Sequence, residues 1–403
     1  MCPTLNIPAS KSILENGMCI KHSRAYYSPI ANVLSYLSRP HDKVRFESDM
    51  AWLLSRHNYA TKGRSDFHHE KLHYTKAELI DRVISLDGRK FFTLLSAYHP
   101  VKTYGCFECR LSLLTGNVAY QKSLLSRLVR DLGRDAVENT DSTFAYCRAF
   151  LKPIFDYDAF REGKVPICED SGKNFKWITN DGDGDGWCCA EFIRGLGVKY
   201  CVYCNADSVY SFNIKGGRAL PYASALDHFL PRHLHPYFAL NLYNLVPCCT
   251  RCNTSLKGKK ETDFRSYASP YSDNLYGSFK LRACHNMNEF GRVVGGDTSR
   301  LCVKYIPLEC DAAGRIAHLM QELFKWEDVY NGIFSEEIKD IFRKTRLLTP
   351  AYKLWMKDMK LIGANSDRLL YGCSMRRSEV CRYRFAKVIQ DFAERYGGVR
   401  LKD

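Results

Sequence analysis

The stretch VPCCTRCNTSLKG, residues 246–258, contains three cysteines within five residues and continues directly with Asn253. Cys249 and Cys252 have the CxxC spacing that turns the backbone so that two thiolates face one metal ion. Cys248 is out of register for such a pair, so we expect it to be a packing residue. The stretch therefore predicts half of a metal site, followed by a helix that begins at an asparagine.

A second CxxC pair, Cys201 and Cys204, lies upstream. Two such turns complete a four-sulfur structural site with no open position, for which zinc is the usual metal. The alternative is two unrelated pairs of buried cysteines in a chain that has 18 cysteines. We predict a structural zinc site with these ligands: Cys201, Cys204, Cys249 and Cys252. The pair Cys106 and Cys109 has no second pair nearby, and we interpret it as a chance spacing.

Composition predicts an ordered globular protein. The 403 residues favour two or three domains, and 45% of them are hydrophobic. An excess of 59 Lys and Arg over 44 Asp and Glu gives a net charge of +15, which attracts polyanions such as nucleic acid. We find no signal-peptide pattern and no membrane-spanning apolar run, so we expect a cytoplasmic protein with mostly reduced cysteines and no membrane partner.

Three polar motifs follow one another between and beside the two cysteine pairs: Asp227-His228, Asn244 in YNLVP, and Asn253 in CNTSLKG. In this order they resemble the HNH endonuclease motif. Proteins with this motif have a DH pair at the end of a strand, an NLVP-like turn and a CxxC-(H/N) sequence at the start of a helix, arranged between zinc-binding cysteine pairs. The resemblance covers residues 201–260. It implies a ββα-metal element that cleaves DNA, with RNA a less favoured substrate.

The resemblance also implies a role for each motif residue. Asp227 and Asn253 would hold a catalytic Mg²⁺ or Mn²⁺, which prefers oxygen ligands. His228 would be the general base, because imidazole titrates near neutral pH. Asn244 would brace the loop backbone and orient His228. Many HNH proteins have a third histidine where this chain has Asn253, and we interpret the change as tuning of the metal site.

Basic residues cluster around the same motifs, where phosphate contact is their natural use. The candidate nucleic-acid contacts are Arg232, Arg251, Lys257, Lys259 and Lys260. A run such as KGKK is otherwise typical of a solvated face.

Residues outside the motif show mainly helical periodicity. We predict an α+β fold, in which a mainly helical protein contains an embedded zinc-bound ββα-metal module. The expected organisation is a helical region at 1–160, a linker or long loop at 161–195, the HNH module at 196–275 and a helical region at 276–403.

Two segments of the C-terminal region have a clear apolar helical face. In the first it consists of Ile316, Leu319, Met320, Leu323 and Phe324. In the second it consists of Cys381, Phe385, Val388, Ile389, Phe392 and Tyr396, before a Gly pair that stops the helix.

A weaker acidic motif lies in the expected linker. Asp181, Asp183 and Asp185 alternate like the first half of an EF-hand loop, but Phe192 stands where the bidentate Glu belongs. A flexible acidic turn and an occasional Ca²⁺ or Mg²⁺ site both remain open.

Three functional hypotheses follow. The first is a metal-dependent HNH endonuclease, and the second is a catalytically silent, zinc-stabilised nucleic-acid-binding module. The third is an effector that stays inactive until a partner or trigger arrives. The chain is also loosely similar to bacterial HNH proteins of phage defence, some of them encoded beside ATPases, so an ATPase or other defence-system partner is the corresponding expectation.

Overall fold

The computed structural model describes residues 154–169, 173–179, 188–213, 221–232, 239–263, 266–271, 273–284, 297–363 and 366–402, with a few residues between 21 and 33. Almost all of the predicted helical region 1–160 therefore lies outside the described residues. The pair Cys106 and Cys109 and the acidic motif at 181–185 lie outside them as well.

The segment expected to be a linker contains regular structure. Helix α10 (Tyr157–Arg161) leads into an antiparallel hairpin of β1 (Lys164–Glu169) and β2 (Lys173–Thr179), and α11 (Cys189–Leu196) follows. Turn residues on both sides of the strands hid this hairpin in the sequence. It is held by aromatic packing, because Phe175 is buried and the Trp177 ring lies 5.8 Å from that of Tyr26.

The middle of the chain forms two more small hairpins and a helix. Strand β3 (Ser211–Asn213) pairs with β4 (Pro221–Ala223), and β5 (Leu226–His228) pairs with β6 (Leu245–Pro247), all antiparallel. A 3₁₀ turn, η8 (Leu242–Asn244), enters β6, and the π-helical η9 (Arg251–Lys257) comes after it. The order of β5, β6 and η9 is therefore strand, strand, helix.

The C-terminal part begins with strands and not with a helix. Strand β7 (Phe279–Cys284) pairs antiparallel with β8 (Cys302–Pro307) over their full length. The helices that follow are α13 (Ala313–Ala317), η11 (His318–Leu323), α14 (Trp326–Asp328), η12 (Val329–Ile333), α15 (Ser335–Leu347), α16 (Pro350–Asp358), α17 (Asp367–Tyr371), η13 (Arg377–Arg382) and α18 (Ala386–Tyr396).

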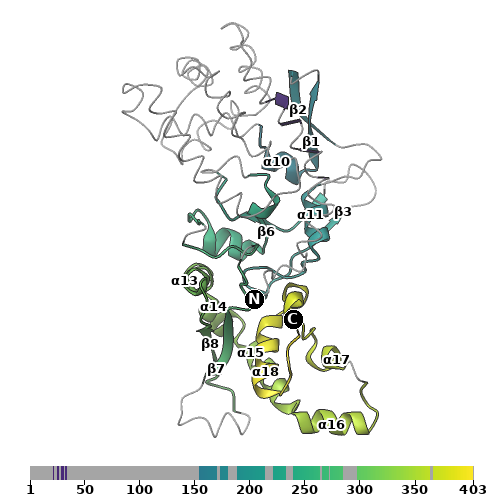
Figure 1. The fold of residues 1–403 in the computed structure, drawn as a ribbon, viewed down its shortest axis with the longest axis vertical. Coiled ribbons are helices and arrows are strands. Elements are labelled where there is room, and N and C mark those ends of the chain that lie inside the picture. Colours follow the sequence, from purple (N-terminus) through teal and green to yellow (C-terminus); the bar gives the residue numbers. More distant parts are fainter. Residues whose placement is uncertain are drawn as a thin grey trace.

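Figure 1 shows β1 and β2 at one end of the molecule, α16 and α17 at the other, and β6 between them. Every sheet in the described part of the chain has two strands. This mixture of helices and small sheets is compatible with the predicted α+β class.

The first predicted apolar face is confirmed. Its five residues are all buried, along α13, η11 and the residue that follows η11. The second face is only partly continuous, because the chain leaves the helical path between η13 and α18, where Phe385 has a left-handed φ of 56°. The helix then ends at Tyr396, before the predicted Gly pair.

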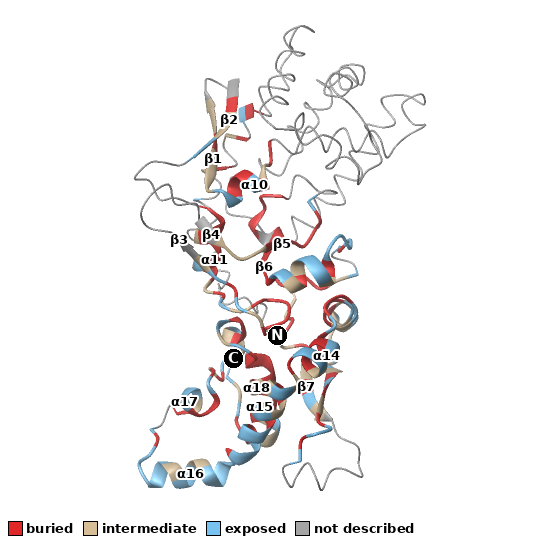
Figure 2. Ribbon diagram, turned by 180° about the vertical axis from the view of Figure 1, so that it is seen from behind, coloured by how far each residue is buried: buried red, intermediate tan, exposed pale blue. Residues whose placement is uncertain are grey.

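A buried ion pair joins α18 to β7. The Lys387 ammonium donates to the Phe279 carbonyl at 2.7 Å and to Asp391 at 3.0 Å, and Asp391 accepts from the Leu281 amide at 2.7 Å. Figure 2 shows α18 as a largely buried helix, whereas α16 is exposed along much of its length. The pair therefore anchors the C-terminal helix in the core.

Buried aromatic residues connect this C-terminal part to the first cysteine pair. The Trp326 indole donates to the Tyr203 carbonyl and the Tyr330 hydroxyl to the Cys204 carbonyl, both at 2.6 Å. The Tyr276 hydroxyl donates to the Val202 carbonyl at 2.5 Å. These bonds satisfy the carbonyls of the turn that carries Cys201 and Cys204. Within the described residues, no helix is long and apolar enough to cross a membrane.

Candidate functional site

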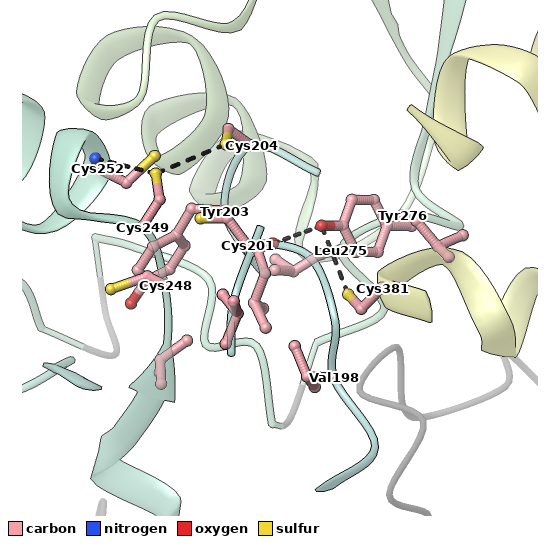
Figure 3. Packing of buried hydrophobic residues seen from close by; sticks show 14 of the residues in the cluster. Val198, Cys201, Tyr203, Cys204, Cys248, Cys249, Cys252, Leu275, Tyr276 and Cys381 are labelled. Carbon is pink, nitrogen blue, oxygen red and sulfur yellow. Dashed lines mark hydrogen bonds between the residues drawn. The ribbon is translucent and has the colours of Figure 1, made fainter. Parts of the chain in front are cut away.

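The two predicted CxxC pairs come together in space. Cys201, Cys204, Cys249 and Cys252 are all buried, and their sulfur atoms lie within 4.8 Å of one another. The Cys204 and Cys249 sulfurs are 3.9 Å apart, and none of the four is in a disulfide. Tetrahedral zinc with bonds of about 2.3 Å needs sulfurs about 3.8 Å apart. The group can therefore hold a metal ion such as zinc (Figure 3).

Local backbone geometry aims these sulfurs. After the first pair, Asn205 adopts a left-handed φ of 52° and its amide donates to the Cys201 carbonyl at 2.8 Å. In the second pair, the Cys252 amide points at the Cys249 sulfur, 3.5 Å away.

Cys248 takes no part in the group. Its side chain is buried, and its thiol faces the Ala225 carbonyl at 3.8 Å. In Figure 3 its sulfur points away from those of the four clustered cysteines. The interpretation of Cys248 as a packing residue agrees with this geometry.

Asp227 lies on β5 with its carboxylate in a buried ion pair. The Lys257 ammonium is 2.7 Å from Oδ1 and 2.8 Å from Oδ2, and the Tyr203 hydroxyl donates to Oδ2 at 2.6 Å. Asp227 is 4% exposed and Lys257 is 3% exposed. Both carboxylate oxygens are thus bound by side chains of the protein.

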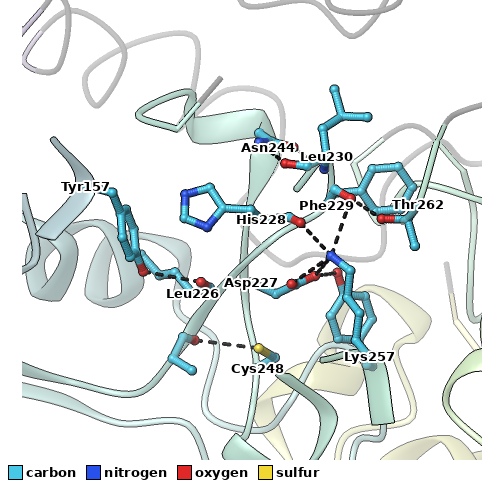
Figure 4. A network of polar contacts seen from close by, with 12 residues as sticks. Tyr157, Leu226, Asp227, His228, Phe229, Leu230, Asn244, Cys248, Lys257 and Thr262 are labelled. Atoms are coloured by element: carbon cyan, nitrogen blue, oxygen red, sulfur yellow. Dashed lines mark hydrogen bonds and ion pairs between the residues drawn. The ribbon is translucent and has the colours of Figure 1, made fainter. Parts of the chain in front are cut away.

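The same ammonium reaches the backbone after Asp227. It donates to the His228 carbonyl at 2.5 Å and lies 3.3 Å from the Phe229 carbonyl. Figure 4 shows Lys257 pointing from η9 at the end of β5, with these oxygens around its Nζ. The Thr262 hydroxyl also donates to the Phe229 carbonyl. Lys257 therefore clamps η9 to β5.

His228 points to the other side of β5. Its Nε2 is 3.0 Å from the Ala239 carbonyl, and its ring lies edge-on to that of Tyr157, with 4.4 Å between centroids. A carbonyl can only accept, so Nε2 carries the hydrogen and the neutral ring keeps its lone pair on Nδ1. Burial, reinforced by the charge of Arg232, lowers the pKa of His228 to about 3. The imidazole is therefore neutral near pH 7, and its pKa lies below the near-neutral value expected from the sequence.

Asn244 holds the loop after β5. Its Oδ1 accepts from the Leu230 amide at 2.6 Å, and its Nδ2 donates to the Leu230 carbonyl at 3.0 Å. The side chain is fully buried, so these bonds satisfy groups that water does not reach. That this brace orients His228 stays a prediction.

The Asn253 side chain belongs to no polar network among the described residues. The backbone of this residue lies in η9, where its N–H donates to the Cys249 carbonyl at 3.0 Å. Its side chain is half-buried, and no described residue forms a hydrogen bond with the side-chain amide. Asp227, its expected co-ligand, is bound on both oxygens by Lys257. A divalent ion needs carboxylate oxygens at about 2.0–2.6 Å. The residues present therefore do not fit a Mg²⁺ or Mn²⁺ ion shared by Asp227 and Asn253.

The five predicted phosphate contacts have different environments. Lys259 and Lys260 are exposed after η9, and exposed Arg232 pairs with Asp158 at 3.0 Å. Arg251 is half-buried: it pairs with Asp207 at 2.8 Å, lies 3.7 Å from the Cys204 sulfur and stacks on Phe334. Lys257 is buried, as described above, and is not placed for contact with a phosphate backbone.

Tyr203 and the inward direction of Lys257 were not predicted from the sequence. One signal for Lys257 was present in the sequence. Residues four apart lie on one helical face, so a helix that turns Asn253 toward Asp227 also turns Lys257 toward it.

Comparison with protein-family models, curated proteins and solved structures gives no match for this chain.

Proposed function

We propose that this protein is an HNH-type endonuclease that hydrolyses phosphodiester bonds of DNA, with His228 as the general base. The observation that supports it most is the arrangement of β5, β6 and η9. These elements have the strand–strand–helix order that the resemblance implies, and the four-cysteine group includes Cys252 of η9 and Cys249 just before it.

In the proposed step, Nδ1 of neutral His228 accepts a proton from water while the water oxygen attacks phosphorus. The bond from phosphorus to the leaving sugar oxygen breaks, and that oxygen takes a proton from solvent. A positioned general base contributes about 10²–10⁴-fold in rate when its pKa lies near the operating pH, so the proposed step requires the pKa of His228 to rise from about 3 when the phosphate anion binds beside it. No part of this step passes through a metal at Asp227, because that carboxylate binds Lys257.

The substrate is proposed from charge and from the resemblance. The net charge of +15 favours a polyanion, and exposed Lys259 and Lys260 continue from η9. The looser resemblance extends the proposal to phage defence with an ATPase partner, which co-purification from a host that expresses both proteins tests.

A second candidate is a zinc-stabilised nucleic-acid-binding module without catalysis. It is favoured by one observation: Asp227 and His228, the two residues of the DH motif, both make buried contacts inside the protein. Such a module would bind DNA with a steep salt dependence and would cleave nothing.

A plasmid assay distinguishes the two candidates. Wild-type protein and His228→Ala are incubated with supercoiled DNA in Mg²⁺ or Mn²⁺, and parallel reactions contain EDTA. In Mg²⁺ or Mn²⁺ we expect nicked or linear product from the wild type and none from His228→Ala. Undiminished cleavage by His228→Ala would contradict the proposed step, and salt-sensitive binding without cleavage under any divalent ion would favour the second candidate.

A further inference from the structure

The Lys257 ammonium lies where a cation bound to Asp227 would lie. Four oxygens surround it: the two carboxylate oxygens of Asp227 and the carbonyl oxygens of His228 and Phe229. This is the chemistry of a small cation site, built from one carboxylate and two backbone carbonyls.

A divalent ion cannot share this position. It would have to approach within about 2.0–2.6 Å of the same oxygens, next to a buried ammonium whose charge repels it. Moving Lys257 away is also unfavourable, since an unpaired ammonium and an unpaired carboxylate would both remain out of contact with water. The Tyr203 hydroxyl, 2.6 Å from Oδ2, occupies a further acceptor position of the carboxylate.

The direction of the neighbouring side chain agrees with this assignment. In Figure 4 the His228 imidazole points away from Lys257, toward Tyr157. Successive residues of a strand face opposite sides. A cation at the Asp227 carboxylate is therefore on the other side of β5 from the proposed base.

We infer that Lys257 is the permanent cation of the Asp227 site, so that Asp227 is a positioning residue that ties β5 to η9 and not a ligand of a divalent ion. The inference stands on the ion pair and not on the proposed nuclease activity. Its tests therefore measure metal binding and stability, and cleavage results do not decide them.

The first test uses the zinc-loaded full chain titrated with Mn²⁺ in a calorimeter. We expect wild type and Asp227→Asn to give the same Mn²⁺ binding isotherm, with any affinities within about twofold, because Asp227 contacts no Mn²⁺. Asn leaves the buried Lys257 ammonium without its carboxylate, so both proteins are titrated at a temperature where circular dichroism shows them folded. A loss of about tenfold or more in Asp227→Asn would overturn the inference, since removal of even an outer partner of a metal ligand costs about 10–100-fold in affinity.

The second test empties the site. Lys257→Ala leaves the Asp227 carboxylate without its cation, so Mn²⁺ should raise the thermal midpoint of this variant. The same ion should leave three proteins unchanged: wild type, the matched control Lys260→Ala, which loses an exposed lysine, and Lys257→Ala/Asp227→Asn. An equal Mn²⁺ response in wild type and Lys257→Ala, whether a rise or none, would overturn the inference. If Lys257→Ala does not fold, the first test decides alone.

Discussion

The Asn244 amide bonds both backbone groups of Leu230, at 2.6 Å to the amide and 3.0 Å to the carbonyl. Asn244→Ala should lower the free energy of unfolding by about 1–3 kcal/mol, because two buried hydrogen bonds are lost. It should also reduce DNA cleavage, if this brace positions the loop that follows His228. Urea denaturation and plasmid nicking measure the two effects.

Asn331 provides a matched control. Its amide bonds the Val303 backbone in the same two-fold manner, at 2.6 and 2.9 Å, between η12 and β8. Asn331 is half-buried, so Asn331→Ala should lose at most the same stability, and it should retain cleavage at temperatures where it is folded. Equal loss of cleavage in both variants would assign Asn244 to stability alone.

Breaking the Asp227–Lys257 pair should destabilise the fold much more than breaking a surface ion pair, because it leaves one buried charge without a partner. Removal of one partner of a buried pair costs about 3–5 kcal/mol, so Lys257→Met should lower the free energy of unfolding by that amount. Lys260→Met, in the exposed part of the same run, should change it by less than about 0.5 kcal/mol. Similar values for the two variants in urea denaturation would show that Lys257 is not held as the structure shows.

Zinc binding should depend on the four clustered cysteines and not on the neighbouring Cys248. Cys252→Ser should lose bound zinc and fold poorly, because zinc affinity is also folding energy in a four-sulfur site. Cys248→Ala should keep its zinc, since that thiol faces the Ala225 carbonyl. Metal analysis of the purified variants by mass spectrometry gives the answer, and zinc retained in Cys252→Ser would exclude the site.

The buried pair of α18 predicts a pH dependence of stability. Burial lowers the pKa of Lys387 to about 8, although Asp391 opposes the change; the charges of Lys280 and Arg377 lower it further. Between about pH 8 and pH 10, the unfolded chain therefore holds this proton more tightly than the folded chain, so this residue's contribution to stability rises with pH. The unfolding free energy of the wild type minus that of Lys387→Met should therefore increase as the pH rises across this window. A constant or falling difference would contradict the assignment.

The parts that could be predicted from sequence are those set by short-range geometry. CxxC spacing specifies how a turn presents two sulfurs, so the four clustered cysteines were identified and Cys248 was left out. Helical periodicity likewise identified the buried face that includes Ile316 and Phe324, because apolar residues three and four apart share one helical face, even though η11 between them is π-helical.

The parts that could not be predicted depend on distant partners. Lys257 belongs to a run that reads as solvated, and only the approach of β5 from 30 positions away shows that it is buried. Arg251 differs from the expectation for a similar reason, since Asp207 and Phe334 lie far from it in sequence. The β1–β2 hairpin was hidden because flanking turn residues outweigh its short alternation of apolar residues.

The central claim is that His228 acts as a base in DNA hydrolysis, and His228→Gln tests it most directly. The Gln side-chain amide can keep the hydrogen bond to the Ala239 carbonyl, but it has no basic nitrogen. Initial cleavage rates of wild type and His228→Gln on one duplex DNA should differ by about 10²–10⁴-fold at equal zinc content. Rates within about twofold of each other would contradict the account.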